Sequence, residues 1–192
     1  MSRPHPDGPH KLRLFFALWP RDSLRAALAG MAGRAAAGIE GEPVPPGNLH
    51  VTLAFLGMVA GSQLGSLIEI GGSDAWPPVP LIFDRVEYWT RPRVLVAMPT
   101  DRPASGEAIV DGLWTGLERV GHVREARPWR PHLTLVRRIR RPPSRDLPSP
   151  GRVEADGRDW RLALVESTWH PEGPRYKPLA EWPLGAGGDS PL

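Results

Sequence analysis

"NLHVTLAFLG", residues 48–57, has the alternation of a β-strand with one apolar and one polar face. Successive side chains of a strand point to opposite faces, so His50 and Thr52 are expected side by side. Gly57 is expected to end the strand. The apolar residues expected on the buried face are Leu49, Val51, Leu53 and Phe55. The stretch predicts a sheet that packs one side into the core and presents a His–Thr pair on the other.

A second stretch of the same design, "RPHLTLVRR", occupies residues 130–138. Here Leu133 and Leu135 are expected on the buried face, and His132 and Thr134 on the opposite one. The chain has six histidines in all, and two of them stand in this setting. If the two strands lie near each other, two imidazoles flank one cleft.

Such a cleft is suited to acid–base chemistry on a phosphate. Unperturbed histidine titrates near pH ~6.5, so one ring can accept a proton while the other donates one, without metal. The hydroxyls of Thr52 and Thr134 are suited to bind oxygens of the group between the rings, and Arg137 could add charge-assisted hydrogen bonds. The alternative is that both histidines are structural, each satisfied by a backbone group.

Composition sets the fold class and excludes several kinds of site. The chain has 192 residues and is 41% hydrophobic, which is enough for a core, and its 24 prolines and 21 glycines favour many short elements. We therefore expect an α+β fold. There is no cysteine, hence no disulfide, thiol nucleophile or thiolate metal site. No long apolar run or signal peptide is present, so a cytoplasmic protein is expected.

The basic residues are almost all arginine, the only lysines being Lys11 and Lys177, and the formal net charge is +3. Arginine presents a planar fork that suits phosphate, so the composition permits a partner that carries phosphate. A GC-rich coding sequence would also replace surface lysine by arginine. Charge alone therefore does not decide between these explanations.

Strands and helices alternate along the chain. A helix capped by Asp22 and stopped near Gly38 is expected to follow the first strand, with an apolar side made of Leu24, Ala27, Leu28, Met31 and Ala35. Strands are predicted at 12–19, 49–56, 79–89, 93–99, 132–136, 160–169 and 175–182, further helices at 62–70 and 104–120, and a proline-rich loop at 140–150. Residues 11–185 are expected to form one domain between disordered tails at 1–10 and 186–192.

These motifs resemble those of a known family. "RLFFALWP" (13–20) is similar to the opening strand of the two-histidine phosphoesterases, specifically the RNA 2',3'-cyclic phosphodiesterases, also called the 2'-5' RNA ligase family. "NLHVTLAFLG" resembles their first signature and "RPWRPHLTLVR" (127–137) their second, including an Arg five residues after the His. "ESTWHPEGPRYKPLAEWPL" (166–184) resembles their closing hairpin. Only the ends and the proline-rich loop lie outside the resemblance.

The resemblance implies two pseudo-symmetric antiparallel-sheet lobes with outer helices around a central cleft. It implies hydrolysis of an RNA-terminal 2',3'-cyclic phosphate to a 2'-phosphate without metal or other cofactor, and the reverse 2'-5' ligation. His132 would activate water and His50 would protonate the departing 3' oxygen, although the two roles could be exchanged. Thr52, Thr134 and Arg137 would bind the phosphate. The expected partner is RNA or a nucleotide with a cyclic phosphate end, bound by a monomer that does not contact membranes.

Three further residues are candidates for binding substrate. Trp129 and Arg130 precede the second histidine, where a ring could stack on a base and a guanidinium could meet a phosphate. A core tryptophan and a solvated arginine are the alternative. Tyr176 falls in the closing hairpin near the implied cleft, where a packed tyrosine is the simpler explanation.

Two other classes of function compete with the phosphoesterase. A zinc hydrolase would need three protein ligands, and the two strands supply no third one. A non-catalytic RNA-binding module on the same fold would retain its function when His50 is replaced, whereas a phosphoesterase would lose turnover.

Overall fold

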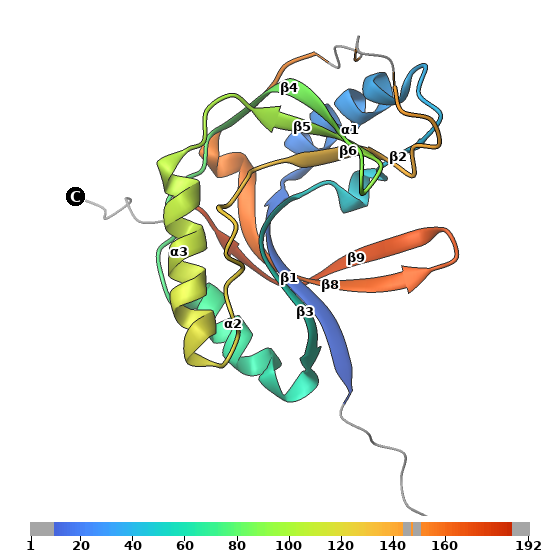
Figure 1. Cartoon of the computed structure of the whole chain (residues 1–192). Helices are drawn as coiled ribbons and strands as arrows, with labels where there is room; N and C mark the ends of the chain where they lie inside the picture. The colour runs from blue at the N-terminus through green and yellow to red at the C-terminus, as the bar shows by residue number, and fades with distance from the viewer. Residues whose placement is uncertain (1–9, 144–146, 148–150, 186–192) are drawn as a thin grey trace, which may run out of the picture.

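Two antiparallel sheets form the framework of the protein, and the computed structural model describes residues 10–143, 147 and 151–185 (Figure 1). The first sheet has the strand order β3-β1-β8-β9, and the second has the order β2-β6-β5-β4-β7. The strands are β1 (Lys11–Pro20), β2 (Glu42–Pro43), β3 (Val51–Ala60), β4 (Leu81–Trp89), β5 (Val94–Pro99), β6 (Leu133–Arg137), β7 (Val153–Ala155), β8 (Trp160–His170) and β9 (Gly173–Pro183). This is the α+β architecture expected from the sequence.

In the described part of the chain, three helices cover the outer faces. They are α1 (Asp22–Ala36), α2 (Leu64–Gly72) and α3 (Ala104–Arg119), and short 3-10 turns lie at Pro46–Asn48, Gly61–Gln63 and Gly157–Asp159. Helix α1 packs on β2, β6 and β7 of the second sheet, while α2 and α3 pack on β3, β8 and β9 of the first. The inner faces of the two sheets are thereby left for the cleft. No helix in the described part of the chain is long and apolar enough to cross a membrane.

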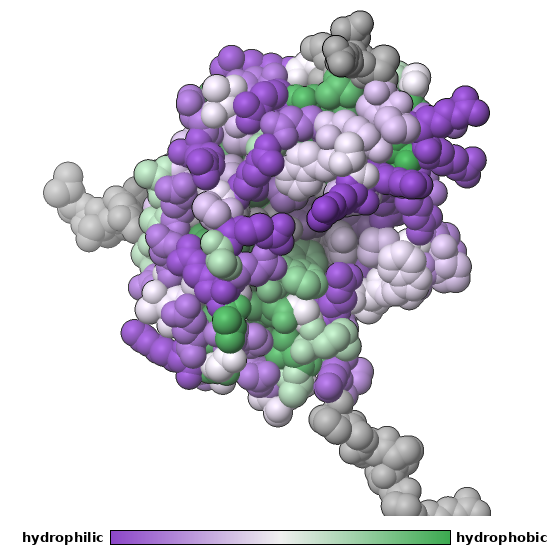
Figure 2. Space-filling view, viewed as in Figure 1, coloured by the Kyte–Doolittle hydropathy of each residue, from purple (hydrophilic) through white to green (hydrophobic). Residues whose placement is uncertain are grey.

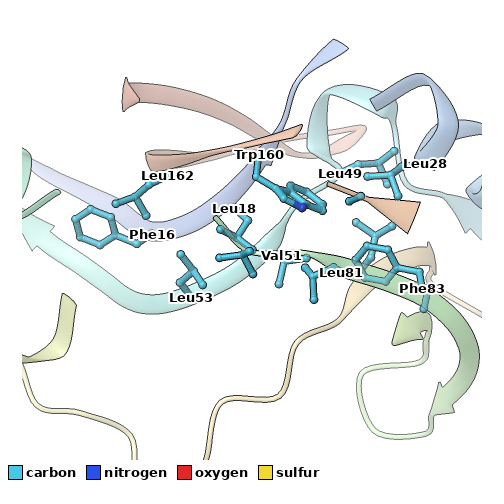
Figure 3. Packing of buried hydrophobic residues seen from close by; sticks show 14 of the residues in the cluster. Phe16, Leu18, Leu28, Leu49, Val51, Leu53, Leu81, Phe83, Trp160 and Leu162 are labelled. Atoms are coloured by element: carbon cyan, nitrogen blue, oxygen red, sulfur yellow. The ribbon is translucent and has the colours of Figure 1, made fainter. Parts of the chain in front are cut away.

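One apolar core connects the two sheets (Figure 3). Trp160 of β8 is fully buried and packs edge-to-face on Phe83 of β4, with ring centroids 6.3 Å apart. A second, smaller cluster lies on the other face of the first sheet and consists of Phe15, Ala17, Trp19, Ala163 and Val165. Strand β1 is therefore buried on both faces, which explains why its sequence is a continuous apolar run instead of an alternating one.

Two expectations for β3 are wrong, and both errors come from bulges. In its pairing with β1, Phe16 faces Ala54 but Ala17 faces Thr52, so Leu53 is an extra residue. A second shift lies at Leu56. Beyond the first bulge the faces are exchanged, and Phe55 is opposite Phe15 with 43% of its surface exposed instead of entering the core. Gly57 does not end the strand: it has φ +70° at the second bulge, a conformation that glycine adopts without strain.

Smaller differences concern helix and loop boundaries. The N-cap of α1 is Arg21, without a side-chain cap, and Asp22 is the first helical residue. Ala27 is exposed because it lies at one edge of the apolar stripe of α1. At the other edge of the stripe, Ala32 is buried. Strands β2 and β7 escaped prediction because they are two and three residues long. The expected tails, except His10, and most of 144–150 lie outside the described residues.

Candidate active site

His50 immediately precedes β3 and is held by two hydrogen bonds. Its Nδ1 lies 2.7 Å from the backbone oxygen of Asn48, and its Nε2 lies 3.1 Å from Thr52 Oγ1. A carbonyl oxygen can only accept, so Nδ1 carries the hydrogen. In the neutral ring Nε2 is then the basic nitrogen, and the threonine hydroxyl donates to it. The His–Thr pair expected from the alternation is thus present.

His132 is anchored in the same way just before β6. Its Nδ1 donates to the backbone oxygen of Arg130 at 2.8 Å, again two residues earlier in the chain. Thr134 follows on β6, opposite Val96, and is half-buried. Both motifs therefore fix the same tautomer through the same local geometry, in which Nε2 is the ring nitrogen without a hydrogen when the imidazole is neutral.

Aromatic rings contact both histidines. The His50 ring lies 4.9 Å from Phe15, 5.1 Å from Tyr176 and 5.9 Å from Trp19, measured between centroids. The His132 ring lies 4.5 Å from Trp89. These rings remove water from the imidazoles and restrict their orientation.

The surroundings lower the basicity of both histidines. Burial lowers the pKa of His50 to about 4, the hydrogen bond to Asn48 opposes this shift, and positive charge on His132 adds to it. Burial also lowers the pKa of His132, and the nearby Arg130 guanidinium contributes in the same direction. Burial raises the pKa of Tyr176. Because a charge on His132 acts on His50, the two rings belong to one electrostatic site.

A cavity of about 270 Å³ reaches one residue of each motif, Thr52 and His132, whereas His50 and Thr134 are not in its wall. Its walls include Thr52, Phe55, Trp89, Trp129, Arg130 and His132. The exchange of faces at the first bulge of β3 is what places Phe55 in this wall. On the face of the molecule shown in Figure 2, hydrophilic side chains gather in the upper part, over the second sheet. Hydrophobic side chains are exposed in the lower part, over β3. The site is therefore polar on one side and apolar on the other.

Arg137 at the end of β6 is suited to receive an anion. Its side chain is only 15% exposed, and its Nε lies 3.9 Å from Glu42 Oε2, too far for a hydrogen bond. This buried Nε has no hydrogen-bond partner among the described residues. A Cβ added at Gly173 would lie 2.8 Å from a terminal nitrogen of the guanidinium, so the β8–β9 hairpin lies directly against it. A buried donor of this kind is costly unless a ligand satisfies it.

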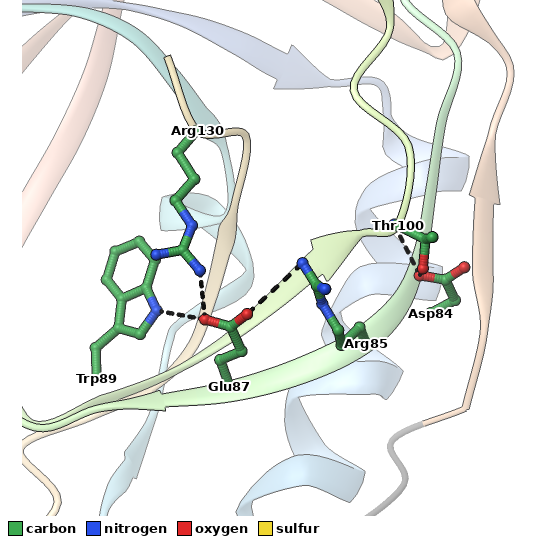
Figure 4. A network of polar contacts seen from close by, with 6 residues as sticks. All are labelled: Asp84, Arg85, Glu87, Trp89, Thr100 and Arg130. Carbon is green, nitrogen blue, oxygen red and sulfur yellow. Dashed lines mark hydrogen bonds and ion pairs between the residues drawn. The ribbon is translucent and has the colours of Figure 1, made fainter. Parts of the chain in front are cut away.

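Trp129 and Arg130 both line the cavity of about 270 Å³ but have protein partners. Trp129 donates its Nε1 hydrogen to the backbone oxygen of Thr52 at 2.9 Å, which ties the segment before the second motif to the first motif. Arg130 pairs with Glu87 at 2.6 Å and lies over the Trp89 ring at 5.2 Å (Figure 4). Whether either contacts substrate stays a prediction.

The sequence did not single out several residues that organise this site. Asn48 is buried; its Nδ2 donates to the backbone oxygen of Pro174 at 2.6 Å, and its Oδ1 accepts from the Tyr176 amide at 3.2 Å. Trp89 packs against the His132 ring, and the Trp89 Nε1 hydrogen is donated to Glu87 at 3.1 Å. Of these residues, only Asn48 had a sequence position that could have marked it as part of the site, because it stands two residues before a motif histidine.

No group of three or more His, Cys, Asp or Glu side chains that could hold a metal ion occurs among the described residues. The zinc hydrolase alternative therefore finds no ligand set in residues 10–143, 147 and 151–185.

Comparison with known proteins identifies similar chains. A family model described as LigT like Phosphoesterase matches residues 18–96. The RNA 2',3'-cyclic phosphodiesterase of Escherichia coli (strain K12) is 29% identical over 177 residues, which cover 90% of this chain and 96% of that protein. The protein of the same name from Thermus thermophilus is 29% identical over 192 residues, with 90% of each chain covered.

Solved structures show the same architecture. Escherichia coli LigT in apo form superposes with a TM-score of 0.75 at 28% identity, covering 91% of this chain and 98% of that one. Its complex with 3'-AMP gives a TM-score of 0.76 at 28% identity, covering 92% and 99% of the two chains. The same protein has been crystallised with NADP+, with phosphate and with ATP. The expected fold class is confirmed.

Proposed function

We propose that this chain, which belongs to the LigT-like phosphoesterases, acts as an RNA 2',3'-cyclic phosphodiesterase that produces a 2'-phosphate end. The general activity is supported by relatives that carry that name and that align with this chain over nearly their whole length. The observation that supports the mechanism is the shared anchoring of His50 and His132 through Nδ1, which makes Nε2 the nitrogen for proton transfer in each ring; in the free protein His50 Nε2 accepts a hydrogen bond from Thr52. Substrate enters between the two motifs.

In the proposed reaction His132 removes a proton from water, and the water oxygen bonds to phosphorus. The bond from phosphorus to the 3' oxygen breaks, and protonated His50 gives its Nε2 proton to that oxygen. The product is a 2'-phosphomonoester with a free 3' hydroxyl. The 2'-5' ligation follows the same path with a 5' hydroxyl in the place of water: the 5' oxygen bonds to phosphorus, the bond to the 3' oxygen breaks, and a 2'-5' phosphodiester is left.

Three groups would stabilise the phosphate while it carries extra charge. Thr52 and Thr134 hold non-bridging oxygens, and Arg137 supplies the Nε hydrogen, which has no hydrogen-bond partner among the described residues. Arg130 and Tyr176 would line the substrate, with Trp129 as a stacking surface. No metal takes part in any of these steps.

The lowered pKa of His50 favours a role for substrate in charging the site. With a pKa of about 4, the ring is neutral in the free protein near pH 7. A phosphodiester anion between the rings raises the pKa of both imidazoles, because an opposite charge within about 4–6 Å favours the charged form. Binding thus prepares His50 as the acid.

Product analysis tests this proposal. The protein is incubated with adenosine 2',3'-cyclic phosphate in the presence of a chelator, and the phosphomonoester is identified by chromatography against 2'-AMP and 3'-AMP. We expect 2'-AMP from the native protein and no turnover from His50→Ala or His132→Ala, each of which should fold. His170→Ala, at an exposed hairpin end, serves as control. Release of 3'-AMP, or loss of activity in the chelator, would refute the mechanism.

A further inference from the structure

Four arginines converge on a second cavity beside the catalytic one. This cavity, of about 480 Å³, has Arg85, Arg102, Arg127 and Arg130 in its wall together with Thr100, and no acidic side chain among the described residues lines it. The arginines come from separate places in the chain: β4, the turn before α3 and the segment before the second motif. A convergence of guanidinium groups from three segments is the arrangement that binds phosphate oxygens through paired hydrogen bonds.

The positive charge of this arginine cavity is not fully neutralised by the protein. Glu87 is shared by Arg130 at 2.6 Å and Arg85 at 3.6 Å (Figure 4), and Glu125 pairs with Arg127 at 3.2 Å. Arg102 donates instead to the backbone oxygen of Trp129 at 3.3 Å. Even when Asp84 is counted, which holds Thr100 at 3.0 Å, the arginines outnumber the contacting carboxylates. A net positive cavity of this size attracts an anion.

The arginine cavity continues directly from the catalytic one. Arg127, Pro128 and Arg130 line both cavities, so this segment forms a shared wall. On the catalytic side of that wall the rings of Phe55, Trp89 and Trp129 line the cavity. An RNA strand that leads away from the catalytic histidines therefore meets aromatic side chains first and guanidinium groups next. Single-stranded nucleic acids are bound by this combination of stacking surfaces and positive charge.

We propose that the arginine cavity binds a backbone phosphate of the RNA strand that carries the cyclic end. This inference rests on the proposed function and names its substrate class: the protein acts on oligonucleotide ends in preference to cyclic mononucleotides. A mononucleotide fills the catalytic site alone and gains nothing from Arg85 and Arg102, which line only the second cavity. Nucleoside polyphosphates such as ATP share the phosphate chemistry and are the competing occupant.

The test compares two substrates that have the same terminal nucleotide. One is adenosine 2',3'-cyclic phosphate, and the other is an RNA hexanucleotide that ends in it. We expect kcat/KM to be at least about tenfold higher for the hexanucleotide, the scale of one or two hydrogen bonds to charged groups. In Arg85→Gln/Arg102→Gln the ratio of the two kcat/KM values should fall to about one. Raising the salt concentration should lower kcat/KM more steeply for the hexanucleotide than for adenosine 2',3'-cyclic phosphate.

A control variant removes the same charge elsewhere. Arg141 and Arg152 are exposed, are paired with Glu40 and Glu154, and do not line the cavity. The hexanucleotide preference should therefore survive in Arg141→Gln/Arg152→Gln. A ratio near one in the native protein, or a preference that the Arg85/Arg102 variant retains, would overturn the proposal. The proposal would also be overturned if the Arg85/Arg102 variant kept the hexanucleotide preference but bound ATP more weakly, because the cavity would then bind the polyphosphate and not the RNA backbone.

A binding measurement separates this proposal from the proposed function. The hexanucleotide with a 2'-phosphate end is labelled with a fluorophore at its 5' end, and its Kd is measured by anisotropy. We expect the Arg85/Arg102 variant to bind about tenfold more weakly and the Arg141/Arg152 variant to bind like the native protein. Failure of hydrolysis with this binding pattern intact would reject the enzyme mechanism alone, whereas equal Kd values would reject the arginine cavity alone.

Discussion

At the scale of the residue, the two motifs are alike in a way that the sequence only partly foretold. The His–Thr spacing predicted that each pair shares a strand face, and alternation alone was sufficient for that. It could not predict that Nδ1 of each histidine donates to a carbonyl two residues earlier, because that depends on the turn before the strand. Nor could it predict Trp89 beside His132, since Trp89 is 43 positions away and nothing in its own sequence setting marks it.

The lowered pKa of His50 predicts how stability depends on pH. Between the unfolded value near 6.5 and the folded value of about 4, the unfolded chain binds a proton that the folded protein does not. Stability should therefore fall as pH decreases through this range, by at most about 3 kcal/mol from His50, because each pKa unit corresponds to about 1.36 kcal/mol. Urea unfolding at pH 7 and pH 4.5 measures the loss.

The comparison variant is His50→Asn, which has no titrating ring. Its stability should decrease less than that of the native protein between pH 7 and pH 4.5, because the proton uptake by the unfolded chain is gone. Equal losses in both proteins would mean that His50 titrates normally in the folded state.

The same lowered values predict the pH dependence of turnover. The rate constant kcat/KM reports the free enzyme, in which both histidines have lowered pKa values, whereas kcat reports the complex. We expect a bell-shaped kcat/KM profile centred below pH 6.5, and a kcat profile displaced to higher pH by the bound anion. Both are measured with adenosine 2',3'-cyclic phosphate. Coincident profiles would contradict this account of how substrate charges the site.

At the scale of the element, most strands and helices were predictable because their apolar patterns are local. The errors occur in β3, where extra residues at Leu53 and Leu56 break the alternation and turn Phe55 toward the cleft. A bulge depends on pairing with β1, so a single strand read alone cannot reveal it. The displaced face matters for function, since it adds an aromatic ring to the catalytic cavity.

The attachment of the β8–β9 hairpin to the first motif gives a prediction at this scale. Asn48→Ala removes two hydrogen bonds to β9 and leaves the Pro174 carbonyl and the Tyr176 amide without their partner. We expect a loss of about 1–3 kcal/mol in the free energy of unfolding. A fall in kcat/KM should accompany it, because Tyr176 lies against His50.

Ser73→Ala is the control for this substitution, since it deletes an exposed hydrogen bond to Ile70 at the end of α2. It should change stability by less than about 0.5 kcal/mol. If both variants unfold at the same urea concentration as the native protein, the hairpin is held by other contacts.

At the scale of the whole molecule, the core determines how many units unfold. We propose that residues 11–185 form one cooperative domain, because the apolar cluster runs through both sheets without a break. Composition predicted the α+β class, but the packing of α1 on the sheet that does not contain β1 is a property of topology and was beyond any local pattern.

Unfolding of a core variant tests this proposal. Trp160 links the sheets through Phe83, so Trp160→Ala should lower the stability of the whole domain by about 3–5 kcal/mol. Circular dichroism and tryptophan fluorescence should report the same single urea transition. Trp169→Ala, at a site that is 73% exposed, should be nearly neutral. Two separate transitions would show that the lobes fold independently.

The account as a whole depends on a phosphorus atom lying between His50 and His132. A crystal structure of the protein with 2'-AMP measures this directly. We expect the phosphate oxygens within about 2.6–3.2 Å of Nε2 of both rings, with Arg137 as a further donor. A 2'-phosphate bound by only one histidine, or held in the arginine cavity with both rings empty, would contradict the account.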